Sequence, residues 1–165
     1  MTPTPEELVA AAAGDVARFA ATVSLPAAEW ESVRDRGDVA WGVGAAVVDA
    51  GRLLLVRQRG QWLLPGGMLE PDERHAEGAA REVYEETGVP VEVTGLGAVV
   101  EQTFRNAATD EAFDVAFVAF HATPEHTRLA DDPGLEGEAI EDVAWHGTVP
   151  ADTFQREMVT ALFEG

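Results

Sequence analysis

The chain has 165 residues, 46% of them hydrophobic, and carries 30 acidic residues against 11 basic ones, for a formal net charge of −19. This length and apolar content suffice for one compact domain with a core and leave little room for two. The negative charge opposes binding to nucleic acid backbones and to anionic membranes, because both attract basic surfaces.

The same composition bears on the cellular compartment. Cysteine is absent, which excludes disulfides, thiolate metal sites and a cysteine nucleophile. The Ala10–Ala13 stretch is bracketed by Glu6, Glu7, Asp15 and Arg18 rather than forming a secretory leader, and no apolar run approaches the ~20 residues of a membrane span. We therefore expect a cytoplasmic protein.

The net charge of −19 favours a halophilic protein. Molar salt shortens the Debye length to about 3 Å, so repulsion between the acidic side chains is screened. A specific cationic partner is the alternative explanation of the charge.

Two helices are expected in the first part of the chain. Pro5 and the acidic residues after it form a favourable helix start, and apolar residues then recur at helical spacing to about Val23. A second short helix is expected after Pro26, carrying Trp30 and Val33. Residues 1–37 are thus predicted to be an N-terminal helical extension, a candidate for a homodimer contact, and residues 38–165 the main domain.

The apolar period changes after Val39. A hairpin is predicted from the two apolar runs on either side of a turn at 49–52, followed by a short strand that ends at Pro65-Gly66-Gly67. A helix is expected from about Asp72 to Thr87, ended by Gly88. The remaining expected elements are strands over Val91–Thr103, Ala112–Ala122 and Ile140–His146, an acidic loop over Thr123–Ala139, and a helix over Asp152–Phe163. This order predicts an α+β fold, an α/β/α sandwich with a mixed sheet.

Three carboxylates share one face of the predicted central helix. Glu82, Glu85 and Glu86 stand at i, i+3 and i+4, where like charges repel each other. A neighbouring face is apolar and suited to pack on a sheet: Ala76, Ala79, Ala80 and Val83. Clustered carboxylates are the ligands that Mg²⁺ or Mn²⁺ requires, whereas a solvated acidic face in an acidic protein is the plainer explanation. The cluster alone does not decide between the two.

The segment from Gly67 to Val89 resembles the Nudix box. That box reads Gly, five residues, Glu, seven residues, Arg-Glu, an aliphatic residue, any residue, Glu-Glu, any residue, Gly and an aliphatic residue. All nine fixed positions are filled: Gly67, Glu73, Arg81, Glu82, Val83, Glu85, Glu86, Gly88 and Val89. The resemblance covers 23 residues directly, and the strand order from about Val39 onward is similar to the family's sandwich.

The resemblance implies a set of site residues. Glu82, Glu85 and Glu86 would be the catalytic residues and the ligands of Mg²⁺ or Mn²⁺, joined by the carbonyl of Gly66. Glu73 and Arg81 would pair and brace the loop rather than touch the metal. Family members often add an acid from a distant loop, for which the candidates are Asp132, Glu136 and Glu138. The general base would be a glutamate of the cluster or that loop acid.

The resemblance also implies a reaction. A Nudix hydrolase cleaves the diphosphate linkage of a nucleoside diphosphate joined to another moiety, by attack of metal-activated water on phosphorus. The alternative is a Nudix-fold module that binds or senses a nucleotide without cleaving it, against which the intact glutamate set argues.

Four residues are candidates for substrate contact: Arg57, Arg59, Trp62 and Arg105. The arginines would meet phosphates or else pair with surface acids, and Trp62 would stack on a base or else belong to the core or its rim. Arg105 stands where the ADP-ribose-cleaving branch has a proline, the coenzyme A signature is missing before the box, and the isoprenoid isomerase branch needs a cysteine. The sequence therefore leaves the substrate open.

Overall fold

The computed structural model describes residues 5–12, 14, 16–35, 41–130 and 140–164. Its elements in chain order are α1 (Pro5–Ala11), β1 (Ala17–Leu25), α2 (Ala27–Asp35), β2 (Trp41–Asp49), β3 (Arg52–Gln58), β4 (Gln61–Leu63), β5 (Gly66–Met68), α3 (His75–Thr87), β6 (Val91–Asn106), β7 (Ala112–Pro124), β8 (Asp142–His146) and α4 (Arg156–Glu164). The strands form one mixed, curled sheet in the order β1-β6-β7-β2-β3-β4, with β5 beside β2 and β8 beside β3. The predicted α+β fold with a mixed sheet is confirmed.

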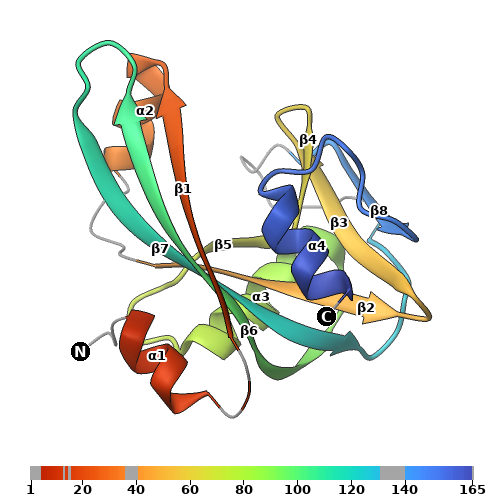
Figure 1. Cartoon of the computed structure of the whole chain (residues 1–165). Helices are drawn as coiled ribbons and strands as arrows, with labels where there is room; N and C mark the ends of the chain where they lie inside the picture. Colours follow the sequence, from red (N-terminus) through yellow and green to blue (C-terminus); the bar gives the residue numbers. More distant parts are fainter. Residues whose placement is uncertain (1–4, 13, 15, 36–40, 131–139, 165) are drawn as a thin grey trace.

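The sheet opens into two parts at the hairpin of β2 and β3. These strands pair over the two residue pairs next to their turn, Val48 with Leu53 and Asp49 with Arg52. Away from the turn the two strands have different neighbours. β2 runs parallel to β7, whereas β3 is flanked by β4 and β8. Figure 1 shows the long strands β1, β6 and β7 rising on one side and β3, β4 and β8 on the other. A cavity lies where the two parts diverge.

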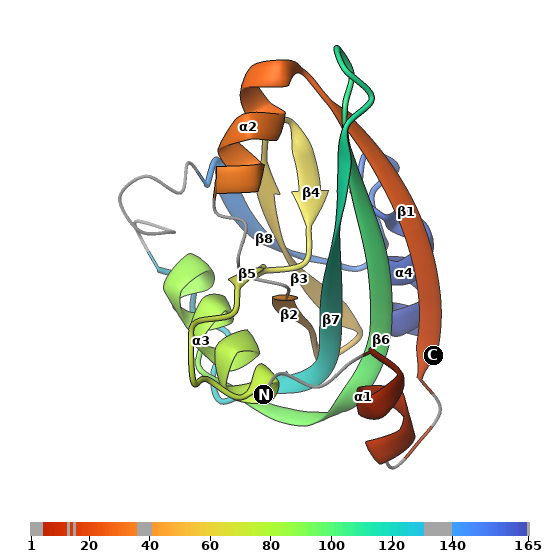
Figure 2. The ribbon, with the colours of Figure 1, turned by 90° about the vertical axis from the view of Figure 1, so that its left-hand side faces the viewer.

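The core lies on both faces of the sheet, and β3 shows why. Leu53 and Leu55 face one way and pack with Val159 of α4, whereas Leu54 and Val56 face the other way and pack with Val83 of α3. Because a strand covered on both faces needs no polar positions, this stretch is continuously apolar. The two helices accordingly lie on opposite sides of the sheet (Figures 1 and 2).

The ends of α3 are set by local backbone chemistry. Gly88 has φ 78° and its N–H donates to the Tyr84 carbonyl at 2.8 Å, as expected for a glycine that ends a helix. The helix begins at His75 rather than near Asp72, because Asp72 has φ 66° and the Glu73 N–H closes a turn onto the Glu70 carbonyl. Glu73 therefore lies in the loop that leads into the helix.

The prediction of a first helix reaching Val23 was wrong. That helix ends at Ala11, and Ala17–Leu25 is a strand that pairs in parallel with β6. Phe19 and Val23 are four residues apart, a spacing that fits a helix as well as one face of a strand, and the open edge of β6 decides for the strand. The second helix is confirmed as α2, where the Trp30 indole N–H donates to the Phe104 carbonyl at 3.2 Å. The domain boundary near residue 37 stays a prediction.

None of the helices in the described ranges is long and apolar enough to cross a membrane.

Candidate active site

The loop that precedes α3 lies directly on the helix's glutamates. Gly66 donates its N–H to Oε1 of Glu86 at 2.6 Å. A Cβ atom on Gly67 would come within 2.5 Å of the Glu82 carboxylate, and one on Gly66 within 2.5 Å of the Val43 carbonyl oxygen. Glycine is therefore required at Gly66, where the neighbouring atoms are backbone, whereas a side chain at Gly67 would displace the Glu82 carboxylate.

The three glutamates differ in burial. Glu82 and Glu86 are buried, with 6% and 5% of their surface exposed, whereas the Glu85 side chain keeps 24%. Removing a carboxylate from water costs much free energy unless hydrogen-bond donors or cations replace its hydration. Glu86 receives the Gly66 N–H, and Glu82 receives the guanidinium of Arg81 at 2.9 Å. The site thus holds buried carboxyl groups beside a backbone loop.

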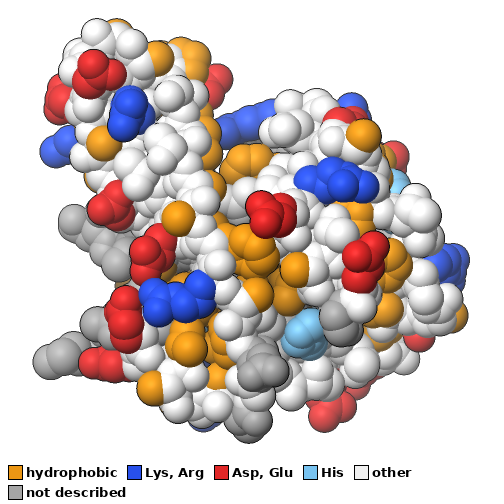
Figure 3. All heavy atoms as spheres, in the orientation of Figure 1, with side chains coloured by type: hydrophobic (Ala, Val, Ile, Leu, Met, Phe, Trp, Pro, Cys, Tyr) orange, Lys and Arg blue, Asp and Glu red, His pale blue; other side chains and the backbone are white. Residues whose placement is uncertain are grey.

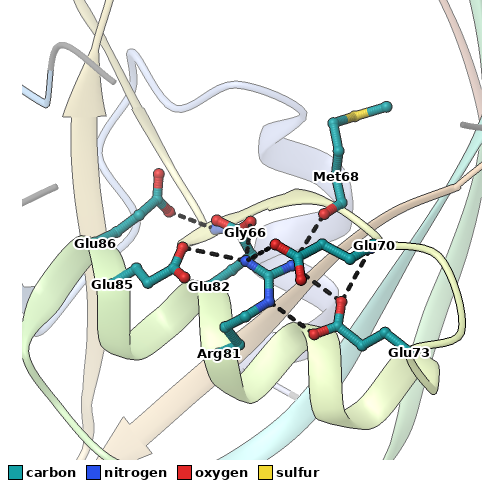
Figure 4. A network of polar contacts seen from close by, with 8 residues as sticks. All are labelled: Gly66, Met68, Glu70, Glu73, Arg81, Glu82, Glu85 and Glu86. Atoms are coloured by element: carbon teal, nitrogen blue, oxygen red, sulfur yellow. Dashed lines mark hydrogen bonds and ion pairs between the residues drawn. The ribbon is translucent and has the colours of Figure 1, made fainter. Parts of the chain in front are cut away.

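Arg81 is the centre of this polar network (Figure 4). It donates twice to Glu73, from Nε at 2.7 Å and from Nη2 at 3.0 Å. Its Nη2 also donates to the Met68 carbonyl at 3.1 Å, and its Nη1 to Glu85 at 3.1 Å. The Arg81 hydrogen bonds lower the pKa of Glu73, and the same bonds raise the pKa of Arg81. Arg81 of α3 therefore connects the helix to the loop that precedes it, through its bonds to Met68 and Glu73.

The loop acid Glu70 belongs to the same network, and the sequence did not single it out. Its N–H donates to Glu73 at 3.0 Å, and its carboxylate lies 3.7 Å from Nη1 of Arg81. Its position between Gly67 and Glu73, inside the loop of the box, was the available signal.

The donor set matches a divalent metal in kind. Glu82, Glu85 and Glu86 offer carboxylate oxygens beside the Gly66 backbone, and carboxylate and carbonyl oxygens are the ligands that Mg²⁺ accepts. Within the described ranges, however, no three acidic or histidine side chains converge as a ready metal site. Arg81 Nη1 lies between Glu82 and Glu85 instead. A metal would share or take over the oxygens that the guanidinium now binds.

The predicted loop acids Asp132, Glu136 and Glu138 lie outside the described residues.

Arg57 and Trp62, two of the substrate candidates, contact each other beside β4. The guanidinium of Arg57 lies 5.5 Å from the Trp62 ring, donates to Asp152 at 3.1 Å and donates to the Gly60 carbonyl at 3.0 Å. The Trp62 ring also contacts the ring of His146 edge-on. Arg57 is thus engaged with acidic and backbone partners, and a substrate contact of either residue stays a prediction.

The other two candidates, Arg59 and Arg105, are exposed. Arg59 lies in the turn between β3 and β4 with φ 54°, and Arg105 stands near the end of β6, opposite Ala112 of β7. Their substrate contacts also stay predictions.

A cavity of about 210 Å³ lies next to the glycine loop, in the hollow between the two parts of the sheet. Its wall includes Gly66 and Gly67, so it adjoins the backbone that covers the glutamates. The rest of the wall is mainly apolar, with phenylalanines from β6 and β7 and side chains of α4, and it includes two glutamines, Gln102 and Gln155. The sequence analysis missed this cavity, because its residues come from distant segments; the alternation of Phe113, Val115 and Phe117 was the available signal.

Comparison with known proteins identifies the family. The family described as NUDIX domain matches residues 39–159, and the chain belongs to the Nudix hydrolase family. The MutT-like protein of Streptomyces ambofaciens is 52% identical over 64 residues, which are 38% of this chain and 42% of that protein. Nucleoside diphosphate-linked moiety X motif 6 of Mus musculus is 42% identical over 67 residues, 37% of this chain and 21% of that protein. The matches therefore span less than half the length of these relatives.

Solved structures share the fold. A NUDIX hydrolase from Nitrosomonas europaea has a TM-score of 0.58 at 24% identity and covers 75% of this chain and 69% of its own. A UDP-X diphosphatase has a TM-score of 0.55 at 23% identity, with 85% and 70% covered. A MutT NUDIX hydrolase from Burkholderia pseudomallei has a TM-score of 0.53 at 26% identity, with 74% and 95% covered.

Proposed function

We propose that the chain hydrolyses the diphosphate linkage of a nucleoside diphosphate joined to another moiety, with Mg²⁺ or Mn²⁺ as cofactor. The observation that carries this proposal is the lining up of Glu82, Glu85 and Glu86 on one face of α3, beneath the glycine loop. Membership in the Nudix hydrolase family supports it, as does the similarity to a relative named for nucleoside diphosphate-linked moieties.

The roles of the residues follow from their placement. Glu82, Glu85, Glu86 and the Gly66 carbonyl would hold the divalent ion. The ion would neutralise phosphate charge and make bound water more acidic, which are its usual contributions to phosphoryl chemistry. A glutamate of the cluster, or an acid from the 131–139 segment, would orient the attacking water and accept its proton.

Arg81 and Glu73 act as positioning residues in this proposal. Arg81, on α3, binds both the Met68 carbonyl in β5 and Glu73 in the loop that leads into the helix. Its two bonds to Glu73 remain available when the metal takes over Glu82 and Glu85. The pair would therefore keep the loop, and with it the Gly66 carbonyl, in place whether or not the ion is bound.

A second candidate function is a module that binds the nucleotide without cleaving it. The bridging of Glu82 and Glu85 by Arg81 favours this alternative, because the guanidinium satisfies carboxylates that a metal would otherwise hold. Turnover separates the two functions, since both bind nucleotides.

A panel assay tests the proposal. ADP-ribose, dinucleoside polyphosphates, nucleotide sugars and deoxynucleoside triphosphates are incubated with the protein in molar KCl, with Mg²⁺, with Mn²⁺ and with a chelator. We expect metal-dependent release of a nucleoside monophosphate from at least one compound. Glu77→Gln is the matched control, since Glu77 lies on α3 but is exposed and paired with Arg74. Binding without hydrolysis across the whole panel would favour the non-catalytic module.

The net charge of −19 supports two further proposals, a high-salt cytoplasm and a chain that binds neither nucleic acid nor membrane. A melting temperature that rises between about 0.1 M and about 2 M KCl is expected for the first, and an unchanged one would contradict it.

A homodimer through the N-terminal helices is also proposed, and sedimentation equilibrium tests it.

A further inference from the structure

The sheet ends in two edges of different character. At one end of the strand order, β4 has three residues, and Trp62 bonds to the Asp152 carbonyl and to the Phe154 N–H of the chain beside it. At the other end, β1 has nine residues and, within the part of the chain that the structure describes, pairs only with β6. Figure 2 shows β1 as the outermost of the raised strands, and Figure 3 shows that the raised tip stands clear of the neighbouring surface. A long strand edge is therefore left open.

This open edge lacks the features that usually protect one. Natural sheets protect their edges with charged side chains, proline, β-bulges or very short strands. β1 contains no proline, and its register with β6 is unbroken over all nine residues. Its one charged side chain, that of Arg18, is paired with Glu6 at 3.2 Å and with Glu101 at 3.0 Å. The edge is thus suited to pair with another strand.

Alternate residues of β1 direct their backbone groups to the open edge. The Leu25 carbonyl accepts the Ala107 N–H at 2.9 Å, so it points toward β6. Because the backbone groups of successive residues point to opposite edges of a strand, the odd-numbered residues of β1 bond to β6. The even-numbered ones point outward: Arg18, Ala20, Thr22 and Ser24.

The sequence of β1 is complementary to itself in one antiparallel register. With Ala21 on a two-fold axis, the whole strand pairs with its copy, and the outward residues face each other as hydrogen-bonded pairs. Apolar side chains then meet apolar ones, and no two like charges are directly opposed. The resulting pairs are Ala17 with Leu25, Arg18 with Ser24, Phe19 with Val23, Ala20 with Thr22, and Ala21 with itself.

The charges favour a second copy over a charged partner of another kind. The side chains of β1 are uncharged apart from Arg18, whose charge Glu6 and Glu101 balance, so the edge does not select an acidic or a basic strand. Each copy of the chain carries −19, and two copies therefore repel each other at low salt. Salt screens this repulsion and should strengthen the pairing of two copies, whereas it would weaken the binding of a basic partner.

We propose that two copies of this chain join along β1, antiparallel and centred on Ala21, so that their sheets become continuous. The inference rests on the homodimer proposed above and places its contact on the strand between α1 and α2 rather than on these helices. The pairing gives partners to the outward backbone groups of both strands and brings Phe19 of each copy against Val23 of the other.

A proline at the edge tests the backbone pairing. Thr22→Pro removes one outward N–H and leaves the bonds to β6, and edge strands tolerate proline at such positions. Thr22→Val is the matched control, because it keeps the N–H. In sedimentation equilibrium in molar KCl, wild type and Thr22→Val should dimerise alike. The dissociation constant of Thr22→Pro should be at least about ten-fold higher, since symmetry removes the bond twice.

Thermal melts show that both variants are folded. A dissociation constant of Thr22→Pro equal to that of wild type would overturn the proposal, and so would a wild-type dimer that weakens as KCl rises from about 0.1 M to about 2 M.

Single cysteines test the register in a chain that contains none of its own. In Ala21→Cys the two substituted positions would lie about 4.5 Å apart between Cα atoms, which a disulfide can span. In Ser24→Cys they would lie about 20 Å apart, because each is opposite Arg18. On oxidation we expect a covalent dimer of Ala21→Cys and none of Ser24→Cys. No cross-link in Ala21→Cys, or an equal one in Ser24→Cys, would overturn the proposal.

The outcomes separate this inference from the other proposals. A wild type that stays monomeric up to about 2 M KCl overturns both the edge pairing and the homodimer. A dimer that Thr22→Pro leaves unchanged overturns the edge pairing and leaves a contact through the helices. Hydrolysis in the substrate panel is measured independently of both.

Discussion

Two arginines of this molecule are each surrounded by acids, and their environments differ. Arg81 keeps 22% of its side chain exposed, and its partners Glu73 and Glu82 keep 14% and 8%. Arg57 keeps 32%, but its partners Asp152 and Glu141 keep 52% and 49%. The Arg81 bonds to Glu73 are paired and short, whereas the Arg57 contact with Glu141 is 4.0 Å long.

Burial, rather than the number of charged neighbours, is the property in which the two ion-pair networks differ, and it governs how strongly each pair interacts. Exposed pairs are screened by water and salt and contribute about 0 to 1 kcal/mol. A buried network loses much more when one partner is removed, because the other charge is left without its hydration. We therefore expect changes at Arg81 and its buried partners to alter function and changes at Arg57 to alter little.

The largest effect is expected for Glu86→Gln. The amide can still accept the Gly66 N–H but lacks the charge that a metal needs, so kcat should fall by at least about 10²-fold while the fold persists. Steady-state kinetics at saturating metal measure this, with Glu77→Gln as the control on the exposed face. More than about half of wild-type turnover in Glu86→Gln would show that it is not a ligand.

An intermediate effect is expected at Glu73 and Arg81. Glu73→Gln and Arg81→Ala should each lower metal affinity and turnover about ten-fold, or ~1.4 kcal/mol, as residues that orient ligands do. The double variant should lose less than the sum, because the two side chains act as one unit. Additive losses in the double-mutant cycle would show that they work independently.

The pH dependence of stability should also depend on this pair. Arg81 lowers the pKa of Glu73 below its ordinary value of 4.5, so the folded state holds the ionised form more strongly than the unfolded state does. That stabilisation is complete above the ordinary value and is lost as pH falls through the lowered one. In chemical denaturation, the free energy of unfolding of wild type should exceed that of Arg81→Ala near neutral pH, and this difference should shrink on acidification. A constant difference between the two at all pH values would contradict the pairing.

The smallest effect is expected for Arg57→Ala. Its exposed partners predict a loss of at most about 1 kcal/mol in unfolding free energy, shrinking further in molar KCl, with turnover within about two-fold of wild type. Urea denaturation and kinetics check both quantities. A loss of turnover comparable to that of Arg81→Ala would mean that Arg57 contacts the phosphates, as one interpretation of the sequence held.

The sequence predicts features that depend on neighbours along the chain. The turn before β3, the apolar run of β3 and the end of α3 at Gly88 all follow from local patterns, and the spacing of the box identifies the family. The site around Arg81 is likewise local, since its partners lie within one loop and helix.

Features that depend on contacts between distant segments were not predicted from the sequence. Ala17–Leu25 is a strand because β6 offers an edge, which its own spacing does not reveal. The cavity escaped for the same reason, since Gln155 precedes α4 while Phe104 and Phe117 stand on β6 and β7. The start of α3 was misplaced because the left-handed Asp72 allows a turn that helical periodicity does not show.

The most direct test of the central claim, that the α3 glutamates bind a divalent ion, is a Mn²⁺ titration followed by electron paramagnetic resonance. Wild type and Glu77→Gln should bind Mn²⁺ alike, and Glu85→Gln and Glu86→Gln should bind it at least about ten-fold more weakly, since each lacks a charged ligand. Equal Mn²⁺ affinity in all four proteins would contradict the account.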